Sequence, residues 1–179
     1  MGAEERLMVP SKGLDPIVAE YLAQMEEVRR MVKEYVRDLT PEQLSWQPYD
    51  GGNSIATLLL HIAGTETFWI RERLGGEKLS REEWAEYGME DYPKLKSPDG
   101  KDLSYFFSKL DTMREKTRQA IAAIKATDLG RVYQEEFQGK SYTFSVRWML
   151  YHLVEHEAHH KGQIVILRRL GKMPNRREG

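Results

Sequence analysis

Four of the five histidines in this sequence lie in one short stretch, residues 152–160. His156 and His160 are four residues apart, so on a helix their rings project from the same side, about 6 Å apart. Both rings would occupy an apolar helical stripe, and an imidazole in such a core is unfavourable unless its nitrogens have partners. A divalent metal ion bound by both rings is the simplest partner. The stripe consists of Met149, Leu153, His156, His160, Ile164 and Leu167.

The fifth histidine, His61, supplies a third nitrogen for the same site. It lies in the middle of a second predicted helix, with Thr57 and Thr65 one turn away on either side. Alone it would be interpreted as a hydrogen-bonded core histidine, but beside His156 and His160 it predicts a facing ligand. Three histidines with water in the remaining position are typical of an open, catalytic metal site. The chain has no cysteine, so thiolate ligands and disulfides are both excluded.

Several other polar residues near these histidines are weaker candidates. Glu66 and His152 could accept a proton during catalysis. His152 could instead bind the metal itself, or support a histidine that does. His159 is expected at the rim of the site or on the surface.

Two known metal motifs match only in part. The stretch "HEAHH" fits the H-E-x-x-H pattern of zinc proteases, but no suitable third ligand follows it. A di-iron carboxylate site needs two Glu-x-x-His pairs. Glu157 and His160 make one pair, and Leu58 stands where the second glutamate would precede His61. Both interpretations are therefore disfavoured.

Four long amphipathic helices are predicted, at about residues 15–38, 54–74, 102–126 and 146–171, each with an apolar stripe at three- and four-residue spacing. Asn53 is the expected cap of the second helix, and Ser145 that of the fourth. The alternating segment 131–144 predicts a short β-hairpin. Residues 75–101 form a long connection with a short helix of their own. The predicted fold is an all-α four-helix bundle, with a long crossover between helices 2 and 3 and the hairpin before helix 4, in one domain over residues 1–179.

Composition narrows the classes of partner and location. The chain has 27 lysines and arginines against 28 acidic residues, a net charge of −1, so nothing draws it to nucleic acid. No apolar run approaches the ~20 residues of a membrane span, and the charged N-terminus does not resemble a signal peptide. These features predict a cytoplasmic protein that contacts neither nucleic acid nor membrane.

A second apolar stripe lies opposite the histidines on the last helix, and it predicts an interface. An exposed stripe of this kind usually meets a partner, so a homodimer is expected. Packing beneath the hairpin or the crossover is the alternative. The stripe consists of Leu150, Val154, Ala158 and Val165.

The segments that carry the histidines also resemble a known family. "SIATLLLHIAGTETFW" and "HLVEHEAHHKGQI", followed by "LRRLG", are similar to the DinB-like superfamily, which includes YfiT-like metal-dependent hydrolases. The family pattern is a histidine on helix 2 and His-x-x-x-His-Arg/Lys-Gly-Gln on helix 4. His61, His156, His160, Lys161 and Gln163 match it, with lysine in place of the commoner arginine. The similarity spans about residues 15–174.

The resemblance implies a bound divalent metal, zinc or nickel first and iron or manganese second, and frequent homodimers. It also implies a small-molecule substrate, in some branches a low-molecular-weight thiol. The leading hypothesis is a metal-dependent enzyme, either a hydrolase or a thiol-dependent S-transferase. The alternative is a non-catalytic stress protein that binds a metal or a small ligand.

Overall fold

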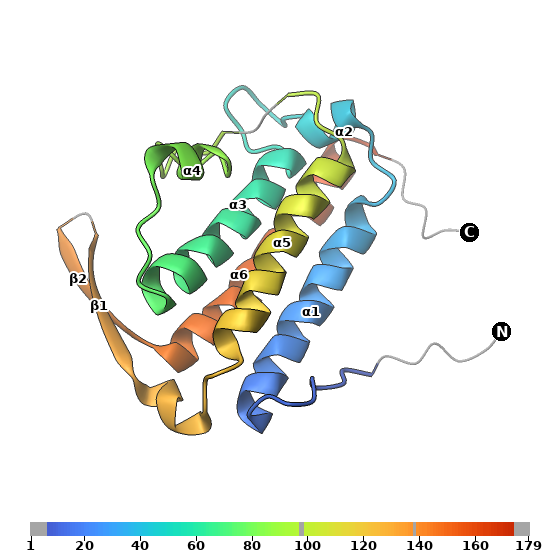
Figure 1. Cartoon of the computed structure of the whole chain (residues 1–179). Helices are drawn as coiled ribbons and strands as arrows, with labels where there is room; N and C mark the ends of the chain where they lie inside the picture. The colour runs from blue at the N-terminus through green and yellow to red at the C-terminus, as the bar shows by residue number, and fades with distance from the viewer. Residues whose placement is uncertain (1–6, 97–98, 138, 174–179) are drawn as a thin grey trace.

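The computed structural model describes residues 7–96, 99–137 and 139–173, so both ends of the predicted domain 1–179 lie outside the described residues. The chain is mostly helical, as predicted, and its long helices lie side by side (Figure 1). They are α1 (Pro16–Val36), α3 (Ile55–Thr67), α5 (Leu103–Ile121) and α6 (Val146–Leu170). Helix α1 packs along α6, α3 packs along α5, and α3 also contacts α6.

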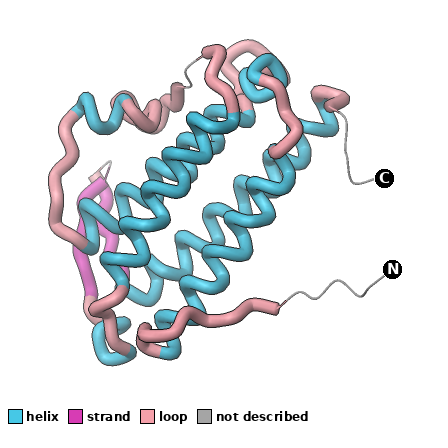
Figure 2. Tube along the Cα trace, turned by 45° about the vertical axis from the view of Figure 1, so that its right-hand side comes forward, coloured by secondary structure: helices cyan, strands magenta, loops and turns pink. Residues whose placement is uncertain are grey.

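Shorter elements connect the long helices. Helix α2 (Pro41–Ser45) follows α1, and the connection from residue 75 to α5 holds α4 (Arg81–Ala85). A 3₁₀ turn, η2 (Ala126–Gly130), leads into strands β1 (Val132–Phe137) and β2 (Lys140–Ser145). These form the predicted antiparallel hairpin, with Val132 opposite Ser145, beside the helical layers (Figure 2).

Helix starts are fixed by side-chain caps. Asp15 accepts a hydrogen bond from the amide of Ile17, and Pro16 occupies the first turn, where its missing N–H is not needed. For α3 the expected cap, Asn53, is wrong by one residue. The hydroxyl of Ser54 accepts from the amide of Thr57 at 3.1 Å, from an extended backbone that suits a cap.

Two predicted helices end earlier than their patterns suggest. The second changes after Thr67 into a π-helical turn, η1 (Phe68–Leu74), in which Trp69 and Ile70 are both buried. The third ends at Ile121, although the alanines after it favour a helix. The amide of Ala126 bonds to the Asp15 carboxylate at 2.9 Å instead of continuing the helix. A tertiary contact therefore overrides local propensity here.

The apolar core is divided into two clusters, with polar residues between them. One cluster lies toward α2 and includes Val32, Leu59, Leu110 and Ile164. The other lies toward the hairpin and includes Val18, Met25, Met113 and Met149. Each of the four long helices also buries at least one polar side chain. These residues include Arg29, His61, Glu66, Arg114, Glu157 and His160.

The second stripe on α6 is not the open surface that its pattern predicted. Leu150 is fully buried, and Val154, Ala158 and Val165 are half-buried. The exposed apolar side chains of α6 lie on a neighbouring line instead. They are Trp148, Tyr151, Ile166 and Leu170. No helix in the described part of the chain is both long and apolar enough to cross a membrane.

Candidate metal centre

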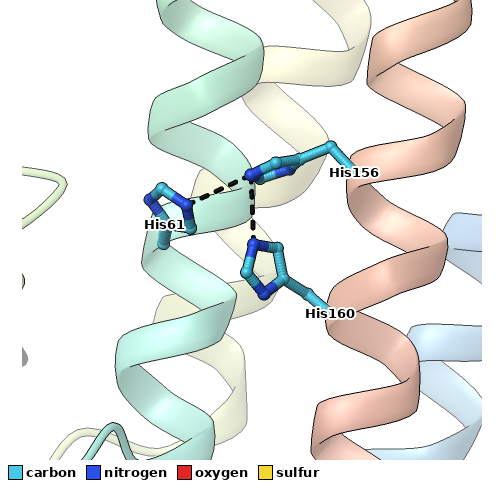
Figure 3. Close-up of side chains that lie close together, drawn as sticks. All are labelled: His61, His156 and His160. Carbon is cyan, nitrogen blue, oxygen red and sulfur yellow. Dashed lines mark hydrogen bonds between the residues drawn. The ribbon is translucent and has the colours of Figure 1, made fainter.

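The structure brings His61, His156 and His160 together between α3 and α6 (Figure 3). The Nε2 atom of His156 lies 3.1 Å from Nε2 of His61 and 3.0 Å from Nε2 of His160. The two α6 rings come from successive turns, as their spacing predicted. His61 and His160 are buried, each 9% exposed, and His156 is half-buried.

Hydrogen bonding alone cannot satisfy this arrangement. A neutral imidazole nitrogen either donates or accepts, and Nε2 of His156 faces two other ring nitrogens and the Thr65 hydroxyl, 3.3 Å away. Nitrogens bound tetrahedrally to zinc at about 2.0–2.1 Å lie roughly 3.4 Å apart, close to the observed spacings. Three converging imidazoles without thiolates therefore fit a divalent ion such as zinc or nickel.

The surroundings keep these rings neutral, as metal binding requires. Burial, together with the neighbouring histidines, lowers the pKa of His156 to about 2. Burial and the charge of His160 lower the pKa of His61 to about 4. Burial also lowers the pKa of His160. Each ring can thus present a lone pair at neutral pH.

A second polar group, here called the ionic network, lies beside the histidines and joins all four long helices. Arg29 on α1 donates to Glu66 on α3 at 2.8 Å and pairs with Glu157 on α6. Arg114 on α5 donates to Glu66 at 2.7 Å and to Glu157 at 3.0 Å. All four side chains are at most 5% exposed. Of their buried nitrogens and oxygens, only Nη1 of Arg114 has no partner in the described residues.

The ionic network decides what Glu66 can do. Burial by itself would raise the pKa of Glu66, but the charges of Arg114 and Arg29 outweigh it and lower the pKa to about 2. The Thr117 hydroxyl also donates to Glu66 at 2.6 Å. A carboxylate with these three partners is a poor proton acceptor.

The two remaining histidines lie at different distances from the site. The ring of His152 is centred 5.4 Å from the ring of His156 and stacks on Trp148 at 4.7 Å. Its Nδ1 lies 3.3 Å from the Glu155 carboxylate, and burial lowers its pKa. His159 is exposed, as expected. Neither joins the cluster in which the three nitrogens converge.

Sequence reasoning missed three neighbours of the site, which are Tyr92, Arg29 and Arg114. The ring of Tyr92 stacks over His61 with centroids 6.3 Å apart, and the hydroxyl of Thr65, expected one turn from His61, contacts His156. Arg29 and Arg114 were not recognised as buried. Arg29 had a detectable signal, because it follows Leu22 and Met25 in a buried stripe that continues through Val32. Tyr92 had none, because its contact depends on the path of a long connection.

The fold and the histidine cluster together define a DinB-like protein. The model of the family described as mycothiol-S-transferase, MST, matches residues 20–171, so the chain belongs to this family. No curated protein matches the chain.

Two solved structures show the same fold at low sequence identity. YfiT from Bacillus subtilis, described as a probable metal-dependent hydrolase with an unusual four-helix bundle topology, is 18% identical, with a TM-score of 0.65 over 97% of both chains. A conserved protein from Enterococcus faecalis is 16% identical, with a TM-score of 0.67 over 86% of this chain and 96% of the other.

Proposed function

We propose that this protein is a metal-dependent enzyme that transfers a low-molecular-weight thiol to an electrophilic small molecule. His61, His156 and His160 are its metal ligands, and zinc or nickel is the ion. The observation that carries the proposal is the convergence of three histidine nitrogens between α3 and α6, in a cluster whose His156 is only half-buried. Three protein ligands leave coordination positions open, which is typical of catalytic rather than structural sites.

The thiol chemistry is supported by the family to which the chain belongs, which is described as mycothiol-S-transferase. A bound divalent ion would lower the pKa of a thiol or water that it binds, or polarise a carbonyl. In the transfer, the thiol loses its proton, a carbon–sulfur bond forms, and the bond to the leaving group breaks. Hydrolysis, in which water takes the place of the thiol, is the second reaction that this site would support.

His152 is the proton acceptor that the geometry favours over Glu66. Its ring neighbours His156, and burial lowers its pKa, so the ring has a free lone pair at neutral pH although burial also makes it a weaker base. Glu155, 3.3 Å from Nδ1, would orient the ring and stabilise its charged form. Glu66 already holds three hydrogen-bond donors.

The test combines metal analysis with turnover. The protein, purified without chelators, should contain about one zinc or nickel ion per chain. With mycothiol and a fluorogenic chloromethyl electrophile, it should form the thioether and release chloride faster than the uncatalysed reaction. His61→Ala should lose both the bound ion and the acceleration of thioether formation. A chain that takes up neither metal above background would overturn the proposal.

The alternative is a non-catalytic protein that sequesters a metal ion or a small ligand. The partial burial of the cluster favours it, because His61 and His160 are each only 9% exposed. A metal-loaded chain that binds one ion tightly, yet accelerates neither thiol transfer nor ester hydrolysis, would support this function instead.

We further propose a homodimer, formed through the exposed face of α6 rather than through the stripe that includes Leu150. Tyr151, Ile166 and Leu170 are each more than half exposed there. Light scattering at micromolar concentration should give twice the chain mass. We also propose that the connection after residue 75 is the long crossover between the second and third long helices. It returns along the side of α3, where Tyr92 stacks on His61 (Figure 1).

A further inference from the structure

Gln163 occupies a particular place on α6. It follows His160 by three residues, so the two side chains lie on the same side of the helix. Its Oε1 lies 2.7 Å from Nδ1 of His160, and its Nε2 lies 3.0 Å from Nε2 of His159. The amide thus spans the gap between a buried histidine of the cluster and an exposed one at its edge.

The contact with Oε1 determines which nitrogen of His160 carries the hydrogen. An amide oxygen can only accept, so Nδ1 of His160 must donate. A neutral imidazole has a single N–H, and Nε2 therefore keeps its lone pair. This Nε2 is the atom that lies 3.0 Å from Nε2 of His156, inside the cluster. With the amide reversed, its NH₂ group would face Nδ1, the hydrogen would move to Nε2, and that nitrogen could not bind a metal.

His61 provides the contrast. Its Nδ1 is buried and has no hydrogen-bond partner in the described residues. Among the described residues, none bonds to Nδ1 of His61 and so fixes its tautomer. Nδ1 of His160, by contrast, has Gln163 as its partner.

We propose that Gln163 is a positioning residue, which holds the tautomer and ring orientation of His160 that metal binding requires, and that His159 anchors the far end of its amide. The inference rests on the metal site of the proposed function. Outer partners of this kind typically change metal affinity by about 10–100-fold.

The experiment compares Gln163→Leu with Gln163→Glu, using zinc alone as the probe in competition with a chelator. Gln163→Leu should lose about 10–100-fold in zinc affinity. Gln163→Glu should bind at least as tightly as the natural chain, because a carboxylate also accepts from Nδ1. His159→Ala should lose at most a few-fold, because the oxygen of the amide remains. Gln119→Leu, on the exposed face of α5, is the matched control and should change nothing.

A second measurement separates this inference from the metal site itself. Nitrogen chemical shifts of His160 in the metal-free protein should show the hydrogen on Nδ1, and in Gln163→Leu a mixture of both tautomers. If zinc binds the natural chain and Gln163→Leu equally well, the role of Gln163 is wrong and the metal site stands. If zinc binds neither, the metal site is wrong, and the tautomer alone decides: hydrogen on Nε2 in the natural chain overturns the role of Gln163.

Discussion

The ionic network and the histidine cluster share the middle of one bundle. They differ in how completely the side chains of each group pair their own charges and hydrogen bonds. In the network, two arginines and two glutamates pair across four helices, so their charges cancel. In the cluster, three neutral rings direct nitrogens at one point, where they compete for the same contacts. Buried side chains whose charges pair with one another support the fold. Buried nitrogens that converge on one point, with too few donors and acceptors among themselves, indicate a site for a ligand.

Neighbouring residues contribute to both groups. On α6, Glu157 directly follows His156, and successive helical residues point about 100° apart. Glu66 likewise follows Thr65, which contacts His156. The network therefore fixes α3 and α6 against each other just where the histidines need a set separation.

The largest effect should come from opening the network. Glu66→Gln leaves Arg29 and Arg114 with one carboxylate between them, and breaking a buried pair in this way costs about 3–5 kcal/mol. Urea unfolding of the metal-free protein measures the change. Glu26→Gln is the control, because Glu26 pairs with the half-exposed Arg118 at the surface and should contribute less than about 1 kcal/mol. Equal, small effects of both changes would show that the network does not stabilise the fold.

Removing a histidine of the cluster should act mainly on the metal-bound state. Zinc at about 100 times its dissociation constant should stabilise the natural chain by about 2.7 kcal/mol. His61→Ala, His156→Ala and His160→Ala should each lose most of this gain, as seen by unfolding with and without zinc. His152→Ala should keep it. Loss of zinc binding in His152→Ala would mean that His152 is a ligand.

Acid should affect the two groups in different pH ranges. The pKa values of His61 and His156, about 4 and about 2, lie below the ordinary 6.5, so the unfolded chain binds more protons below that pH. Stability of the metal-free protein should therefore begin to fall below pH 6.5, by about 1.4 kcal/mol per pH unit for each such group.

Protonation of Glu66 should also lower the stability of the protein, but at a lower pH than protonation of the histidines. The pKa of Glu66, about 2, is depressed from 4.5, so its contribution is complete above pH 4.5 and is lost as the pH falls toward 2. Urea midpoints from pH 8 to pH 3 should show a smaller loss between 6.5 and 4.5 for His61→Ala. A natural chain whose stability is constant down to pH 4.5 would contradict the assignment of buried, neutral rings.

The smallest effect is expected at His159. It is exposed and does not enter the cluster, so His159→Ala should keep zinc binding within a few-fold of the natural chain and leave unfolding unchanged. Chelator competition measures the affinity. A loss as large as that of His160→Ala would place His159 among the ligands.

The sequence predicted the cluster better than the network, for a physical reason. His156 and His160 stand in apolar positions of a strong helical pattern, so their burial could be read locally. Arg114 looks like an ordinary surface charge, and only its place in the stripe from Leu22 to Val32 distinguishes Arg29 from one. The carboxylates that pair with both arginines lie 37 to 128 residues away. The helices and hairpin were likewise predictable from periodicity. The early end of α5, after which the amide of Ala126 bonds to the distant Asp15, was not.

The charge pairing across four helices also has a consequence for how the chain folds. A partial bundle that lacks any one of α1, α3, α5 or α6 would leave an arginine or a glutamate buried without its counter-charge. Compact intermediates of that kind are penalised, and so are arrangements that exchange the positions of two helices. We expect the bundle to assemble in one cooperative step, because only the complete and correctly ordered set of helices pairs every charge of the network.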